Sequence, residues 1–194
     1  MTQSSSSGFG PVYFRLNRRR FLLYGTVTAV NCFFPASILA AVERNLTPEK
    51  NLSFYNTHTQ ESLDICYYRQ GYYCTAALTQ INYILRDHRT NEIRPIDTGL
   101  LDLLHDISAE LPNRSPFHVI SGYRSPTSNA KLRRRSKKVA AFSLHMKGKA
   151  IDIRLPGCPT QNLREAAVNL RRGGVGYYPR TDFVHVDVGR VRRW

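Results

Sequence analysis

Apolar residues recur at helical spacing in the first half of the chain, which predicts elements that serve packing. Residues 75–87 carry apolar side chains three and four positions apart and predict a helix. A second helix is predicted over 98–111, where Pro112 ends it. The β-rich runs 52–55 and 63–68 flank a polar turn and predict a hairpin.

In the second half of the chain, polar side chains gather around short strands. Two further helices are expected, a basic one over 128–135 and another over 161–171. Because strands and helices alternate without regular β-α-β units, the pattern predicts an α+β fold with a small mixed or antiparallel sheet flanked by helices. Four strands are predicted in this half, at residues 117–122, 149–155, 174–178 and 183–188.

Strict alternation along two of these strands separates apolar from polar side chains. In 183–188 the valines point to one face, and His185 and Asp187 point to the other. In 149–155 the isoleucines share one face, whereas Asp152 lies on the opposite face. The aliphatic faces predict core, so Asp152 and His185 are displayed away from apolar neighbours.

His145 joins Asp152 and His185 as a third candidate metal ligand. Two imidazoles and one carboxylate, supplied by a turn and two strands, commonly hold zinc while leaving a fourth position open for catalysis. Seven extended residues between His145 and Asp152 would span roughly 23 Å, so the chain must fold back, and Gly148 permits the turn. For any one of these residues alone, a polar side chain on a solvated strand face is the alternative interpretation.

The first 41 residues have the pattern of an export signal. Basic residues 18–20 precede the uncharged stretch 21–42, which contains small residues near position 40. The run resembles the twin-arginine type of signal, with Asn17 where Ser or Thr is usual. We therefore predict a signal peptide over 1–41 and a periplasmic location. An uncleaved anchor with transient membrane association, or a buried helix, is the alternative, because the stretch is long but only weakly hydrophobic.

The remaining chain is predicted to contain a short linker and one domain. Residues 42–53 are polar around Pro48 and predict a linker or arm, which leaves 54–194 as the domain. The spacing of Cys66 and Cys74 permits a disulfide in an oxidising compartment, although spacing alone does not fix the geometry.

Charge suggests a second class of function. The chain has 28 Lys and Arg against 14 Asp and Glu, and it remains at +10 without the four arginines of the predicted signal. Residues 133–135 form a basic run, which predicts either a solvated face or attraction to an anionic polymer. A non-catalytic binding protein for such a polymer is therefore an alternative. Export argues against nucleic acid as the partner, and we expect a monomer.

Three segments resemble the zinc D,D-peptidase superfamily: SGYRSPTSN at 121–129, SLHMKGKAID at 143–152 and DFVHVDVG at 182–189. The second carries the S-x-H-x-x-G-x-A-x-D signature, and the third supplies acid-x-x-His. From the arginine run to the terminal G-R-V-R-x-W, the chain resembles more narrowly the MepK-type murein endopeptidases.

The resemblance implies a zinc D-Ala-D-Ala peptidase-like fold and a zinc-dependent hydrolase of the cell wall. It would act on peptidoglycan stem peptides. The bonds that it would hydrolyse join D-alanine to diaminopimelate or diaminopimelate to diaminopimelate. The residues do not rank these two bonds. A D,D-carboxypeptidase that removes terminal D-alanine by the same mechanism is the alternative activity.

Carried over by motif, the resemblance also implies a role for each polar residue. His145, Asp152 and His185 would bind Zn²⁺. Arg124 would stabilise the oxyanion formed at the scissile carbonyl. Ser143 would support His145 by hydrogen bonding.

Asp182 would be the general base that takes a proton from the attacking water. Residues three positions apart face opposite ways in a regular strand, so this role requires a bend at Asp182–Phe183. Asp187, on the same face as His185, is the competing candidate, and orientation of a metal ligand is its other expected use.

Overall fold

The computed structural model describes residues 48–136 and 139–194. The predicted signal peptide over 1–41, the first half of the predicted linker, 42–47, and residues 137 and 138, which follow the basic run 133–135, lie outside these ranges. Within the described ranges, no helix is long and apolar enough to cross a membrane.

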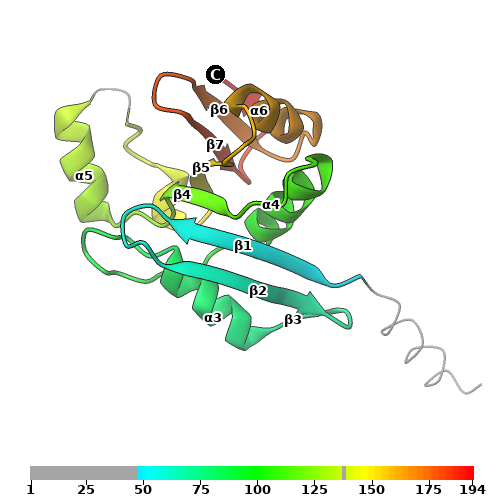
Figure 1. The fold of residues 1–194 in the computed structure, drawn as a ribbon. Helices are drawn as coiled ribbons and strands as arrows, with labels where there is room; N and C mark the ends of the chain where they lie inside the picture. Colours follow the sequence, from blue (N-terminus) through cyan, green and yellow to red (C-terminus); the bar gives the residue numbers. More distant parts are fainter. Residues whose placement is uncertain (1–47, 137–138) are drawn as a thin grey trace, which may run out of the picture. The chain divides into compact units, whose positions relative to one another are not determined.

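Eight strands form one mixed sheet in the described part of the chain. Its order is β3-β2-β1-β4-β5-β7-β6-β8, which Figure 1 shows for the longer strands. The pairs β1–β4 and β6–β8 run parallel, and the other neighbours run antiparallel. The strands are β1 (Lys50–Asn56), β2 (Ser62–Arg69), β3 (Tyr72–Tyr73), β4 (Phe117–Ser121), β5 (Ala150–Arg154), β6 (Gly174–Tyr178), β7 (Phe183–Asp187) and β8 (Arg192–Arg193).

Helices flank this sheet, and the predicted α+β class with a mixed sheet is confirmed. The side chain of Asp97 starts α4 by accepting the N–H of Gly99 at 2.9 Å. Ser125 starts α5, where Pro126 occupies the first helical position. The helices are α3 (Thr75–Ile84), α4 (Thr98–Glu110), α5 (Pro126–Arg135) and α6 (Thr160–Asn169), with a short 3-10 helix, η2 (Leu144–Lys147).

The core lies on the aliphatic face of β5 and β7, as alternation predicts. Ile151, Ile153, Val184 and Val186 are fully buried. Helix α6 contacts β6 and β7, and α4 contacts α6 and β1, so the two helices lie side by side in Figure 1. Their buried side chains belong to the same core as the strand residues. The opposite face of β5 and β7 is therefore left for polar side chains.

Strand β1 begins at Lys50, so residues 50–53 of the predicted linker belong to the sheet. Leu52 is buried, and the strand pairs with β2 on one side and β4 on the other. Hydrogen bonding to two neighbours satisfies the backbone and holds this segment in place.

The cysteines of the described chain are free thiols. Cys66 and Cys74 do not form the disulfide that their spacing permits. The Cys66 thiol instead lies 3.4 Å from the carbonyl oxygen of Tyr68, two residues along the same strand.

Candidate metal centre

The register of β5 and β7 places Asp152 directly opposite His185. Opposed residues on antiparallel strands project to the same face at close range. The Nδ1 atom of His185 lies 2.8 Å from Oδ1 of Asp152. Their side chains are only 12% and 11% exposed, so the interpretation as ordinary solvated residues does not hold for this pair.

His145 reaches this pair from η2. The Oγ of Ser143 accepts the backbone N–H of His145 at 3.4 Å, and Gly148 ends η2 with φ +66°. A Cβ at position 148 would lie 2.3 Å from the carbonyl oxygen of Pro95, so this turn requires glycine. The Nδ1 of His145 lies 2.8 Å from the carbonyl oxygen of Gly122. A carbonyl only accepts, so Nδ1 carries the proton and Nε2 faces the pair.

Three donor atoms form a triangle at this point. Nε2 of His145 lies 3.2 Å from Nδ1 of His185 and 3.3 Å from Oδ1 of Asp152, and the third edge is 2.8 Å. A tetrahedral zinc ion with bonds of roughly 2.0–2.1 Å requires ligand atoms about 3.3 Å apart. The donor types and their separations therefore fit a zinc ion, and the structure brings all three predicted ligands together.

The charges of the three groups also suit a cation. Burial lowers the pKa of His145, which keeps its imidazole neutral. Burial alone would raise the pKa of Asp152, but the two histidines outweigh it and hold that pKa well below its usual range. For His185, hydrogen bonds to Asp152 and Asp187 outweigh burial and raise the pKa. The proton on His185 Nδ1 is thus the one that a metal ion would displace.

Asp187 holds the other nitrogen of His185, with Oδ2 3.1 Å from Nε2. Asp187 is completely buried. Its Oδ1 accepts the N–H groups of Gly174 at 3.1 Å and Gly189 at 2.8 Å, and Arg192 donates to both oxygens. These donors, with His185, hold the pKa of Asp187 far below its usual range despite burial. A carboxylate this occupied is a poor proton acceptor and orients the His185 ring instead.

Asp182 is not brought to the triangle. The required bend exists, since Asp182 has φ +51°. This left-handed backbone takes the side chain out of the alternation of β7, under which Asp182 and His185 would face opposite ways. The hydroxyl of Thr160 donates to its carboxylate, Arg154 Nη1 lies 3.8 Å away, and the side chain is 61% exposed. In this structure Asp182 contacts Thr160 and Arg154, so its predicted role as the base stays a prediction that requires the side chain to turn toward the triangle.

Arg124 lines a cavity of about 760 Å³ in front of the triangle. Its side chain is 11% exposed, and Nη2 lies 3.4 Å from Oδ2 of Asp152 and 3.2 Å from Oγ of Ser121. Within the described chain, its buried Nε–H has no hydrogen-bond partner. Burial lowers the pKa of Arg124, yet a guanidinium stays charged. The arginine is thus placed beside the triangle with an unused donor.

Aromatic side chains that the sequence patterns did not identify also line this cavity. Tyr178 stacks on Phe183 with ring centroids 4.5 Å apart. The ring of Trp194 lies 5.3 Å from that of His185. Phe142 lines the cavity from the loop before η2 and is 89% exposed. Two of these aromatic residues lie in segments that carry the resemblance, Phe183 in DFVHVDVG and Trp194 in the terminal G-R-V-R-x-W.

An α+β fold that directs two histidines and an aspartate into an open cavity is typical of metal-dependent hydrolases. The family model for "Peptidoglycan L,D-endopeptidase MepK" matches residues 45–194. The protein of that name from Escherichia coli strain K12 is 41% identical over 182 residues, covering 93% of this chain and 98% of the relative. "Probable peptidoglycan L,D-endopeptidase MepK" from Haemophilus influenzae is 40% identical over 184 residues, covering 94% and 97%. The chain belongs to this family, which confirms the resemblance.

Proposed function

We propose that this protein is a zinc-dependent endopeptidase that hydrolyses peptide cross-links in peptidoglycan. The supporting observation is the His145–Asp152–His185 triangle at the wall of a cavity that also contains a buried arginine, in a chain of the MepK family. Homologues with hydrolase names support the enzyme class. When bound, zinc would polarise the scissile carbonyl and lower the pKa of water.

The protein's own residues supply orientation and charge for this reaction. Arg124 is held by Asp152 and Ser121, so its guanidinium is preorganised beside the reacting carbonyl. A fixed donor that meets charge developing in the transition state contributes on the order of 3 kcal/mol. Asp187 holds the Nε2–H of His185, which keeps Nδ1 directed at the ligand triangle.

Proton transfer needs an acceptor, and the structure limits the choice. Among the described residues, Asp152 is the one carboxylate that lines the cavity. Asp182 would have to leave Thr160 and Arg154 and turn inward between its cavity-lining neighbours, Thr181 and Phe183. Its role as base is therefore an alternative that depends on this rotation.

The shape and charge of the cavity fit an internal peptide bond with carboxylates nearby. Phe142 and Trp194 line it yet stay 89% and 50% exposed, as expected of an open cleft. Arg124 lines the same cleft and complements a free carboxylate of a stem peptide. An open cleft favours an endopeptidase over a carboxypeptidase, which needs a pocket closed around a chain end.

The names of the relatives guide the choice of bond. Both specify an L,D-endopeptidase. A link between two diaminopimelates joins an L-centre carboxyl to a D-centre amine, whereas D-alanine–diaminopimelate joins two D-centres. We propose the diaminopimelate–diaminopimelate link as the preferred substrate. Such a substrate requires a periplasmic protein, and the predicted twin-arginine signal over 1–41 is the proposed export route.

Digestion of purified sacculi tests this function. Wild-type protein with one equivalent of zinc should release muropeptides cut at the cross-link, identified by chromatography and mass spectrometry. A chelator should abolish release and added zinc should restore it. His185→Ala should bind zinc weakly and release nothing.

The products separate the alternatives. Release of D-alanine alone would indicate a carboxypeptidase. Adsorption to sacculi without any cleavage, by protein that holds no zinc, would indicate a binding protein and overturn the proposal.

A further inference from the structure

The segment Arg192–Trp194 is built into the candidate site. Strand β8 pairs in parallel with β6, and the backbone continues this pairing beyond the strand. The N–H of Tyr177 donates to the carbonyl of Trp194 at 2.9 Å, and the N–H of Trp194 donates to Val175 at 3.2 Å. Alternation then puts Arg192 and Trp194 on one side of the strand and Arg193 on the other.

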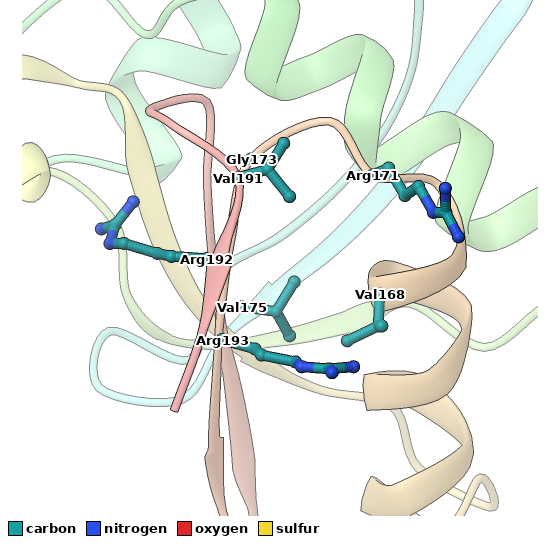
Figure 2. A pocket seen from close by; sticks show the side chains of 7 residues that line it. All are labelled: Val168, Arg171, Gly173, Val175, Val191, Arg192 and Arg193. Carbon is teal, nitrogen blue, oxygen red and sulfur yellow. The ribbon is translucent and has the colours of Figure 1, made fainter.

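The two neighbouring arginines have different surroundings. Figure 2 shows their side chains leaving β8 in opposite directions, with Arg193 beside Val168 over a second cavity of about 450 Å³. Arg192 also lines the cavity that contains the metal ligands. Within the described residues, Arg193 forms no ion pair.

Arg192 forms a bidentate ion pair with Asp187, the carboxylate that orients His185. Its Nη2 lies 2.6 Å from Oδ2 of Asp187, and its Nη1 lies 3.1 Å from Oδ1. This forked pairing fixes the carboxylate plane as well as its charge. The Oδ2 atom is the one that meets Nε2 of His185. Any rotation of Asp187 would therefore turn the His185 ring away from the other ligands.

Trp194 closes this arrangement from the solvent side. Its ring lies 4.9 Å from the Arg192 guanidinium and 5.3 Å from the His185 ring. Its Nε1–H donates to the hydroxyl of Tyr178 at 2.9 Å, which fixes the indole. A Cβ at Gly176 would come within 2.7 Å of the indole, so β6 leaves room for it. The indole thus contacts the Arg192 guanidinium, and this cation–π contact helps to hold the arginine beside Asp187.

We propose that Arg192 and Trp194 are positioning residues for metal binding: Arg192 fixes Asp187, Trp194 holds Arg192, and Asp187 fixes the ring of His185. The inference rests on the proposed zinc site and extends it to a segment with no metal-ligating side chain. Neither residue needs to contact the metal or the reacting atoms.

Zinc affinity measured by chelator competition tests the proposal, with Arg193→Gln as the matched control. Arg192→Gln should weaken zinc binding by roughly 10–100-fold, the usual effect of losing an outer partner of a metal ligand. The zinc affinity of Arg192→Lys should fall between those of the wild type and Arg192→Gln, because lysine keeps the positive charge but cannot form the bidentate pair with Asp187. Arg193→Gln should match the wild type within about twofold. Equal affinity in Arg192→Gln and Arg193→Gln would overturn the proposal.

A double-mutant cycle tests the route through Asp187. If Arg192 acts by fixing that carboxylate, its substitution should have little further effect on zinc affinity in the Asp187→Asn background. Independent, additive losses would contradict the route. Trp194→Phe should retain more zinc affinity than Trp194→Ala. If both variants bind zinc as tightly as the wild type, Trp194 has no part in positioning the ligands.

Failure of the proposed function has a different signature. Wild-type protein that binds no zinc would overturn both proposals. Tight zinc binding without cross-link cleavage would overturn the enzyme alone and leave the positioning test valid. Because Arg192 pairs with the buried Asp187 carboxylate, its substitution should also lower the stability of the zinc-free protein. Urea unfolding measures this loss, and zinc affinity is compared under conditions in which each zinc-free variant is fully folded.

Discussion

At Asp182, side-chain contacts separate a motif from its expected use. The acid-x-x-His spacing matches and φ +51° supplies the bend that the role requires, but the carboxylate contacts Thr160 and Arg154. Spacing along the chain does not encode these contacts. By contrast, His145, Asp152 and His185 were predictable, because alternation and the glycine turn determine where these side chains point.

Asp182→Asn should lower turnover by less than about tenfold and leave zinc affinity unchanged. The amide can keep the contact with Thr160, and Asp182 is not among the residues that line the cavity. Turnover at saturating zinc with a cross-linked muropeptide dimer measures this effect. A general base contributes roughly 10²–10⁴-fold, so a loss of that size would show that Asp182 does rotate inward.

Thr160→Val is the companion variant. It removes the hydroxyl that holds the carboxylate outside. If rotation of Asp182 were part of the reaction, this change should raise turnover. Unchanged turnover in both variants would exclude Asp182 from proton transfer.

Gly148 shows how a short element positions a ligand. Gly148→Ala combines a left-handed φ of +66° with a Cβ placed 2.3 Å from the carbonyl of Pro95. We expect a stability loss well above the roughly 1 kcal/mol that the backbone conformation alone costs, and a loss of zinc affinity because His145 moves. Urea unfolding and chelator competition measure the two effects.

Gly71→Ala is the matched control. Gly71 also has positive φ, +84°, but no atom lies within 4 Å of the added Cβ. It should therefore lose about 1 kcal/mol and keep its zinc affinity. Similar losses in the two variants would mean that the contact with Pro95 is relieved by a small shift.

The turn that carries Arg124 depends on the segment after α3. Asp87 is buried and accepts the N–H of Ser125 at 2.7 Å and that of Arg89 at 2.9 Å. Burial alone would raise its pKa, but hydrogen bonds including these two lower it to about 2. Because the folded pKa lies below the unfolded one, this contribution to stability is present above about pH 4 and is lost as pH falls toward 2.

Asp87→Asn should therefore cost roughly 2 kcal/mol at pH 7, with a gap from the wild type that narrows below about pH 4. Urea unfolding across this pH range measures the gap. Asp64→Asn, on an exposed position of β2, should stay within about 0.5 kcal/mol throughout. A gap for Asp87→Asn that is constant with pH would contradict the ionic origin of the effect.

The hydrophobic pattern could not predict elements of two to four residues. The strands β3 and β8 and the helix η2 contain too few residues to show a period. The longer helices and strands were predictable to within a few residues, mostly because they bury one regular apolar face; α5, whose buried side chains are Ser128 and Asn129, is an exception. The unpredicted strand β8 is also the one that carries Arg192.

At the scale of the whole molecule, strand order was not predictable. Strand β1 lies parallel to β4, although two strands and two helices separate them along the chain. Such pairing depends on long-range contacts that local patterns do not specify. The α+β class could still be predicted, because it depends on the kinds of element present and not on the order of the strands.

Net charge predicts how the molecule meets its substrate. Arg133, Arg134 and Arg135 end α5 and are exposed. Adsorption of the inactive His185→Ala variant to sacculi should weaken as salt rises from about 0.05 to 0.5 M, because screening shortens the reach of the attraction. A pelleting assay measures the bound fraction.

The triple substitution of these arginines by glutamine should flatten the salt dependence and leave turnover on a soluble muropeptide dimer unchanged. Adsorption that is independent of salt in the unsubstituted protein would show that the basic helix has no part in it.

The direct opposition of Asp152 and His185 makes one alignment serve two purposes. The register that sets these ligands face to face also sends the valines and isoleucines of β5 and β7 into the core. A slip of one residue would exchange the two faces and lose both together. A single-residue insertion in either strand is therefore poorly tolerated, so variation in length among functional homologues should be confined to the connecting loops.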